Sequence, residues 1–181
     1  PEGLTVQQAF QRIAENDALS GDMPAEMPPE GGLLAETERF TRGMQRQALV
    51  DKLVDRQQEL VQTVWERRQS DLPINTIEEF VTLASIVEKE TAVSDERPRI
   101  AGVFINRLRE GMRLQSDPTI VYGLFGGAGK PANRAIYRSD IDKTTPYNTY
   151  RINGLPPTPI AIPGRASLEA VANPSRTKEL Y

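Results

Sequence analysis

The chain has 181 residues, of which 38% are hydrophobic and 26% charged, so it can form one domain with a sizeable core. Its net charge is −3 and no basic run stands out, which argues against a nucleic-acid partner. It contains no Cys and no His, which excludes disulfides, cysteine nucleophiles, Ser-His-Asp triads and histidine metal sites within the chain. If the chain is an enzyme, its proton chemistry would therefore depend on Asp, Glu, Lys, Tyr or water. No apolar stretch approaches the roughly 18 residues that a membrane span needs.

The first 33 residues read as a short helix followed by a loop. Thr5 can cap a helix whose apolar positions Val6, Ala9, Phe10 and Ile13 recur at helical spacing. Residues 21–33 are rich in Pro, Gly and Glu, which is typical of a loop. We expect residues 1–33 to be the remnant of a preceding region and residues 34–181 to form the main domain.

Three longer helices follow. Residues 46–69 carry one apolar stripe with charged residues on the other faces. A capping box, T-x-x-E at residues 76–79, opens a second helix that runs to about Glu90. A third is expected from Ser94 or Asp95 to Gly111, where Gly102 suggests a close helix contact.

From residue 112 onward the pattern is irregular. Short apolar pieces, at residues 119–124 and 161–162, alternate with stretches rich in Gly and Pro, and a last short helix fits residues 167–172. These pieces predict loops with short strands or helical turns. The expected fold class is therefore α+β, a helical core with an irregular half that carries short strands.

Two glutamates near the end of the second helix are candidates for acid chemistry. On a helical wheel Glu88 and Glu90 fall about 80° to either side of the centre of the apolar arc, while Lys89 points away. Partial burial at such a border favours the protonated form of a carboxyl group, as a general acid requires. The alternative is an ordinary glutamate at the end of an amphipathic helix, and the periodicity cannot choose Glu88 over Glu90.

Polar groups in the irregular half are candidates for binding. Asp117 precedes Pro118, so it can be a simple helix cap or turn residue, or a second carboxylate. Tyr147 and Tyr150 flank Asn148 and could stack on sugar rings and bind their hydroxyl or acetamido groups, or could be structural. A basic cluster, which includes Arg107, Arg109 and Arg113, could be only a solvated face.

Several of these segments together resemble a known family. The segments are TLASIVEKET at residues 82–91, VFINRL at 103–108, GMRLQSDPT at 111–119, TPYNTY at 145–150, GLPP at 154–157, and Pro163-Gly164 with Ser167-Leu168. In this order they resemble the endolytic murein transglycosylases (MltG, or YceG-like family). The resemblance runs from about residue 72 to residue 181, with a weaker match at residues 34–40.

The resemblance implies a lysozyme-like catalytic core with one essential glutamate. Because that glutamate is followed by a small hydroxyl residue in lytic transglycosylases, Glu90 with Thr91 matches the pattern, and Glu88 is assigned to the rim of the cleft. Substrate-binding roles are carried over to matched positions, namely Thr91, Gln115, Asp117, Tyr147, Asn148 and Tyr150.

The implied function is cleavage of the bond between N-acetylmuramic acid and N-acetylglucosamine in nascent glycan strands. The products would have 1,6-anhydromuramyl ends, and the cleavage would terminate glycan elongation. Because the nucleophile of this reaction comes from the substrate, the resemblance implies no metal and no cofactor. Two alternatives stay open: a hydrolytic muramidase with Asp117 as second carboxylate, and a non-catalytic glycan-binding or scaffold protein.

The family also implies a location and partners. Its members resemble a protein of the inner membrane with a single N-terminal anchor, a small LysM-like domain and a catalytic domain in the periplasm. We expect the anchor to lie outside this chain and the catalytic domain to be truncated at its C-terminus. The expected partners are peptidoglycan strands and peptidoglycan synthases.

Overall fold

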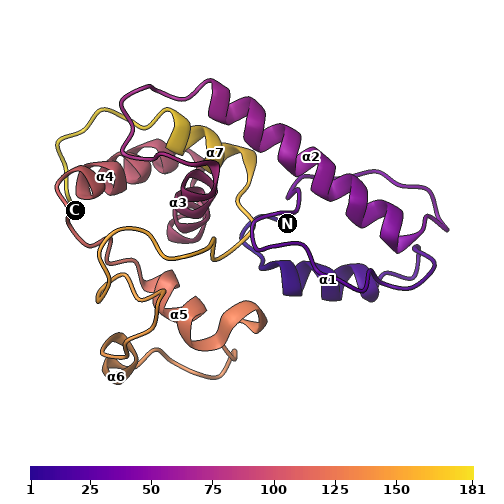
Figure 1. Cartoon of the computed structure of the whole chain (residues 1–181). Coiled ribbons are helices and arrows are strands. Elements are labelled where there is room, and N and C mark those ends of the chain that lie inside the picture. Colours follow the sequence, from indigo (N-terminus) through magenta and orange to yellow (C-terminus); the bar gives the residue numbers. More distant parts are fainter.

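The computed structural model describes all 181 residues, which form a helical protein (Figure 1). The chain contains seven α-helices and two short 3₁₀ helices: α1 (Val6–Ala14), α2 (Arg46–Glu66), α3 (Ile77–Glu90), η1 (Ser94–Glu96), α4 (Arg97–Arg109), α5 (Asp117–Phe125), η2 (Gly126–Ala128), α6 (Arg138–Ile141) and α7 (Arg165–Ala172). No helix combines the length and apolarity needed to cross a membrane.

Helix α3 is the central element, and it packs against α2, α4, α5 and α7 (Figure 1). Phe80, Leu83 and Ile86 are fully buried, as the apolar arc predicts. The N-terminus of α3 is capped where expected, because the Thr76 hydroxyl accepts a hydrogen bond from the Glu79 N–H at 3.2 Å. The Glu79 carboxylate reaches back to the N–H of Asn75, at 2.7 Å, one residue earlier than a standard capping box.

Helix α2 also follows its predicted pattern. Its stripe is buried and consists of Leu49, Val50, Leu53, Leu60, Val61 and Val64. Gln57 lies on the same buried face, where its amide donates to the Gly31 carbonyl at 3.0 Å. The helix ends at Glu66, three residues before the predicted end at residue 69.

From residue 112 onward the chain is mostly irregular, as expected, and its regular elements are short helices. The expected short strands were wrong, so the fold is helical rather than α+β. The apolar piece at residues 119–124 lies inside α5, where Pro118 occupies the first turn that proline favours. Residues 161–162 form no strand, and Ile162 makes backbone hydrogen bonds only with Gly3 and Leu4. Outside the helices the chain forms a single isolated bridge, between Ser20 and Gln45. The apolar pieces are too short to alternate over a whole strand, and helix contacts bury them instead.

The N-terminal segment packs on the same core as the rest of the chain. Val6, Phe10, Leu19 and Leu33 belong to the one hydrophobic core that also contains the buried face of α3. The core thus joins residues 1–33 to residues 34–181. The division of the chain at residue 33 stays a prediction.

The close contact expected at Gly102 is present but involves a loop. A Cβ at this position would lie 2.5 Å from the carbonyl oxygen of Ser175, which follows α7. The chain after α7 crosses α4 at this point, so any side chain larger than that of glycine would collide with its backbone.

Candidate active site

Glu90 is the last residue of α3, and its exposed side chain lines a cavity of about 350 Å³. The other walls come mainly from α4, the turn at Gln115 and the end of the chain near Tyr181. The Ser116 hydroxyl donates to Glu90 Oε2 at 2.8 Å, and no other side chain bonds to this carboxylate. Oε1 is therefore free for a ligand in the cavity.

A network of hydroxyl groups holds Ser116 in place. Ser116 is buried, and its N–H donates to the Thr149 hydroxyl at 2.9 Å. The Thr119 hydroxyl lies 2.8 Å from that of Thr149 and donates to the Ser116 carbonyl at 2.6 Å. Gln115 has a left-handed backbone with φ of 54°, the one non-glycine residue in this region of φ. Such a conformation costs about 1–3 kcal/mol and is often found at functional sites.

Arg107 supports the same turn from the opposite side. Its side chain is buried and lines the Glu90 cavity. The interpretation of the basic cluster as only a solvated face is therefore wrong for Arg107. Its guanidinium donates to the carbonyls of Leu114, the residue before Gln115, and of Leu180. It forms no ion pair with a carboxylate, since its partners are these two carbonyls. Arg107 thereby places a positive charge beside the cavity that contains Glu90.

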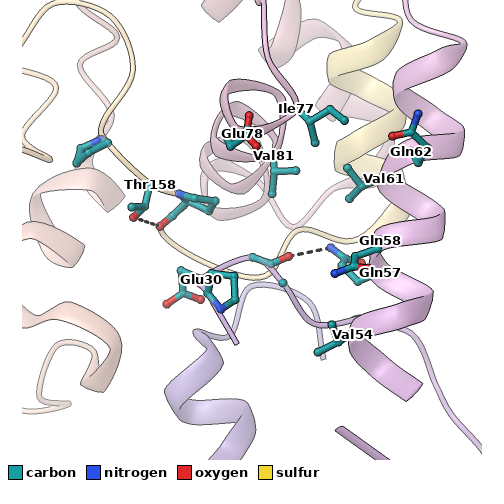
Figure 2. A pocket seen from close by; sticks show the side chains of 15 residues that line it. Glu30, Val54, Gln57, Gln58, Val61, Gln62, Ile77, Glu78, Val81 and Thr158 are labelled. Carbon is teal, nitrogen blue, oxygen red and sulfur yellow. Dashed lines mark hydrogen bonds between the residues drawn. The ribbon is translucent and has the colours of Figure 1, made fainter. Parts of the chain in front are cut away.

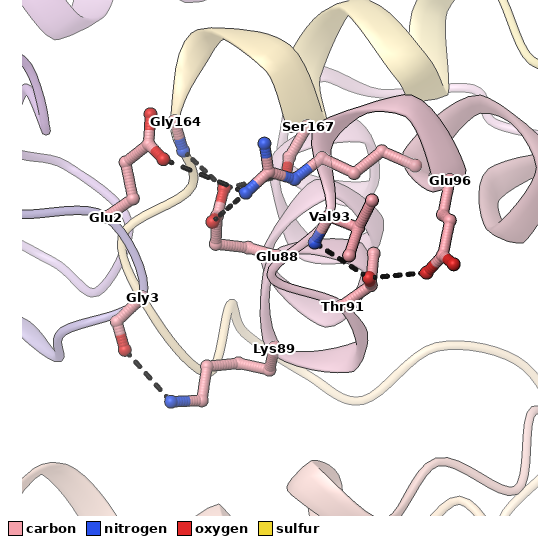
Figure 3. A network of polar contacts seen from close by, with 10 residues as sticks. Glu2, Gly3, Glu88, Lys89, Thr91, Val93, Glu96, Gly164 and Ser167 are labelled. Carbon is pink, nitrogen blue, oxygen red and sulfur yellow. Dashed lines mark hydrogen bonds and ion pairs between the residues drawn. The ribbon is translucent and has the colours of Figure 1, made fainter.

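Glu88 is buried on the other side of α3, so its assignment to the rim was wrong (Figure 3). Its carboxylate accepts three hydrogen bonds, from Arg97 at 2.9 Å, from the Gly164 N–H at 2.9 Å and from the Ser167 hydroxyl at 2.6 Å. Gly164 and Ser167 belong to the N-terminal turn of α7, where backbone N–H groups favour a negative charge. Glu88 thus joins α3 to α7 and α4, and Glu90 is the glutamate of the pair that faces a cavity.

Thr91, the hydroxyl residue after Glu90, shapes the turn into η1. Its hydroxyl accepts from the Val93 N–H at 3.0 Å and donates to Glu96 at 2.8 Å (Figure 3). Glu96 also lines the Glu90 cavity. Thr91 therefore positions a second carboxylate of the cavity wall.

Tyr150 and Asp117 form a pair next to this site. The Tyr150 hydroxyl donates to Asp117 Oδ1 at 2.7 Å. Burial raises the pKa of Tyr150 to about 12, and the hydrogen bond and charge of Asp117 and the charge of Glu90 add to this effect. Tyr150 is thus a protonated donor at neutral pH, close enough to Glu90 to sense its charge.

The other two residues of the predicted cleft segment make contacts within the protein. Asn148 is buried, and its amide donates to the carbonyls of Ile141 and Lys143 and accepts from the Tyr150 N–H at 3.0 Å. The Tyr147 ring lies 5.0 Å from that of Tyr122, and its hydroxyl bonds to Thr158 at 2.8 Å. Asn148 therefore holds the loop that presents Tyr150, while a glycan contact for Tyr147 stays a prediction.

A larger cavity lies elsewhere (Figure 2). Its volume is about 480 Å³, and it is bounded by α2, the start of α3 and the segment 157–159. Its wall residues Ile77 and Val81 precede Glu90 by 13 and 9 positions, which corresponds to roughly 14–20 Å along a helix. Its one half-buried carboxylate, Glu30, has its pKa raised by burial, opposed by hydrogen bonds from the Val6 N–H and Tyr122. Size alone does not make this cavity the reactive one, because it lacks the fixed, accessible carboxylate found at Glu90.

The polar groups of the site are carboxylate, amide, hydroxyl and guanidinium groups. No group of three or more acidic residues is arranged to hold a metal ion. At Glu90 an accessible carboxylate carries one fixed hydrogen-bond donor, which suits a group that donates and accepts a proton.

The whole chain, residues 1–181, matches the model of the YceG-like family. The chain belongs to this family. Over its full length it is similar to a YceG-like protein of Listeria monocytogenes, known from a crystal structure at 2.6 Å, with a TM-score of 0.75 and 27% identity, and it covers 67% of that chain.

Two enzymes are similar in sequence over part of the chain. The endolytic murein transglycosylase of Bacillus subtilis (strain 168) is 42% identical over 106 residues, which are 59% of this chain and 28% of that enzyme. That of Streptococcus pneumoniae serotype 2 (strain D39) is 40% identical over 108 residues, 59% of this chain and 19% of that enzyme. The match thus spans less than a third of either relative.

Proposed function

We propose that this chain is the catalytic part of an endolytic murein transglycosylase, with Glu90 as its acid and base. The observation that carries the proposal is the position of Glu90. Its carboxylate is exposed to a cavity, fixed by Ser116 through one oxygen and free at the other. The names of the two similar enzymes support the reaction class.

The proposed reaction needs only one carboxyl group. Glu90 protonates the glycosidic oxygen between N-acetylmuramic acid and N-acetylglucosamine, and the bond from that oxygen to C1 of the muramyl residue breaks. The oxocarbenium-like centre is stabilised by the negative charge left on Glu90. That carboxylate then accepts the proton of the muramyl 6-hydroxyl, whose oxygen bonds to C1. The product is a 1,6-anhydromuramyl end, and no water is consumed.

Ser116 supports the first half of this cycle. Its hydroxyl donates to Oε2 and stabilises the carboxylate form after the proton has left. The proton transfer then occurs through Oε1. Gln115 and Tyr150 are the side chains we assign to glycan binding, because Gln115 lines the cavity and Tyr150, whose hydroxyl donates to Asp117, is close enough to sense the charge of Glu90.

We extend the proposal to the role of the enzyme in the cell. Cleavage inside nascent strands would terminate their elongation, and peptidoglycan synthases are the expected partners. The enzyme would act in the periplasm from a single anchor in the inner membrane.

The test is digestion of purified glycan strands by the full-length protein, with products identified by mass. Wild-type protein is expected to give 1,6-anhydromuramyl ends. Glu90→Gln, which is nearly isosteric but cannot transfer the proton, is expected to lower the rate by about 10²- to 10⁴-fold. The matched control is Glu59→Gln, the same change at an exposed position of α2, which should keep the wild-type rate.

Other outcomes identify the alternatives. Reducing ends in place of anhydro ends would make the protein a muramidase. An absence of cleavage by wild-type protein that still binds the strands would make it a glycan-binding or scaffold protein.

A further inference from the structure

A second cavity, of about 360 Å³, adjoins the end of α3. Its walls include Lys89, Asp117 and Lys130, together with residues of α1 and the glycine-containing turn after α5. None of these residues has a role in the proton transfer described above.

This cavity and the Glu90 cavity are built on the same two chain segments. Lys89 precedes Glu90, and successive helical residues project about 100° apart, so the two side chains face different sides of the helix end. Ser116 bonds to Glu90, and the next residue, Asp117, lines the second cavity. A group attached to a glycan bound at Glu90 can therefore reach the second cavity across the segment 116–117.

The cations of this cavity have no carboxylate partner. Lys89 Nζ donates to the Gly3 carbonyl at 3.1 Å (Figure 3), and Lys130 Nζ donates to the carbonyls of Pro131 and Arg134. Neither lysine forms an ion pair, whereas Lys52 and Lys143 each pair with an acidic residue. In a chain whose net charge is −3, two unpaired ammonium groups on one cavity are a specific feature.

The only carboxylate of the cavity wall, Asp117, is engaged by the Tyr150 hydroxyl. The remaining polar groups include Thr5 and Gln8, and the Thr5 hydroxyl donates to the Gly127 carbonyl at 2.5 Å, which joins α1 to this wall. The sum of two ammonium groups and one carboxylate is +1, so the cavity favours an anionic ligand.

We propose that this cavity binds a carboxylate of the peptide attached to the muramyl residue next to the scissile bond. The proposal rests on the proposed function and names the part of the substrate that its second cavity recognises. The peptide leaves the sugar ring sideways from the glycan axis, as a cavity beside the Glu90 site requires. Lys89 and Lys130 supply the charge, and the enzyme would thereby prefer strands that carry peptides over strands stripped of them.

The test measures binding by full-length protein carrying Glu90→Gln, so that ligands stay intact. Two probes are made from the same glycan fragments, one with its peptides and one after their removal by an amidase. Dissociation constants are measured for Lys89→Gln with Lys130→Gln, for the charge-retaining pair Lys89→Arg with Lys130→Arg, and for Lys52→Gln. Lys52 is a matched control because it lies on α2, where it pairs with Glu38.

The double glutamine variant is expected to bind the peptide-bearing probe about 10- to 25-fold more weakly, since each partly exposed charge contact is worth up to about fivefold. The loss should shrink as salt rises. The arginine pair should restore binding to within about twofold, and the probe without peptides should bind all variants equally within that range.

Equal weakening for both probes, or the same loss in Lys52→Gln, would overturn the peptide-binding role while leaving the proposed function intact. A parent protein that binds neither probe would refute the proposed function itself, and this proposal with it.

Discussion

Replacing Glu88 by Gln should destabilise the fold, although the two side chains have nearly the same shape. The Glu88 carboxylate satisfies Arg97, the Gly164 N–H and the Ser167 hydroxyl, and both members of the ion pair are less than a tenth exposed. A Gln amide group would direct its hydrogens at one of these donors. It would also leave the buried Arg97 charge without the carboxylate that now neutralises it. Only Glu2, at the longer distance of 3.7 Å and with 40% of its side chain exposed, would remain as a partner for it.

The size of the effect follows from the burial of the pair. Breaking a buried ion pair by removal of one partner costs about 3–5 kcal/mol. The lower end, about 3 kcal/mol, applies here because the Ser167 hydroxyl can turn and accept from the new amide. For a chain of this length that corresponds to a fall in Tm of about 6–12 °C. Glu90→Gln, at an exposed position, should change the free energy of unfolding by less than about 1 kcal/mol.

Urea and thermal unfolding followed by circular dichroism would measure both variants. A second pair of variants separates the lost charge from lost packing. Glu88→Leu combined with Arg97→Met replaces the ion pair by apolar side chains and should be less destabilising than Glu88→Leu alone. The reasoning fails if Glu88→Gln unfolds within about 1 kcal/mol of wild type, or if the double variant costs as much as the sum of its single changes.

Two further predictions concern Ser116 and Glu30. Ser116→Ala removes the hydrogen bond on Glu90 and should lower kcat by about 10- to 100-fold with little change in KM, the loss expected for one charge-assisted bond; an unchanged kcat in strand digestion would refute this role. Burial raises the pKa of Glu30, so the folded chain holds this proton more tightly than the unfolded chain and the free energy of unfolding falls as pH rises from about 4.5 through the raised pKa. Glu30→Gln should therefore gain stability relative to wild type as pH increases in urea titrations between about pH 4 and 8, and a pH-independent difference would contradict it.

The helical elements with clear periodicity were predictable from the sequence. The stripe of α2 and the Thr76 cap with the apolar arc of α3 specify both helices locally, through residues no more than a few turns apart. In the second half only the last helix, α7, was predicted in this way. The other segments are short, and α5 begins at Asp117-Pro118, a pair that reads equally well as a turn.

The roles of Glu88 and Glu90 could not be separated by local reasoning either. Both lie at the border of the apolar arc, and Glu88 is buried because Gly164 and Ser167 come to it from 76 and 79 positions away. Only the resemblance to a family singled out Glu90 beforehand. Ser116 lies inside a matched motif, but its bond to Glu90 could not be predicted. The preceding residue, Gln115, has a left-handed backbone, which the residue type glutamine does not favour.

The last turn of α3 brings three different roles together in three consecutive residues. Because successive side chains leave a helix about 100° apart, Glu88, Lys89 and Glu90 face three different neighbours. Glu88 binds the start of α7 and Lys89 binds the N-terminal segment (Figure 3), while Glu90 lines its cavity. A substitution at one position can therefore tilt the others, since all three depend on the direction of the same helix end. Loss of cleavage in any variant of this turn identifies a catalytic group only when the free energy of unfolding is unchanged, a condition we expect Glu90→Gln to meet and Glu88→Gln to fail.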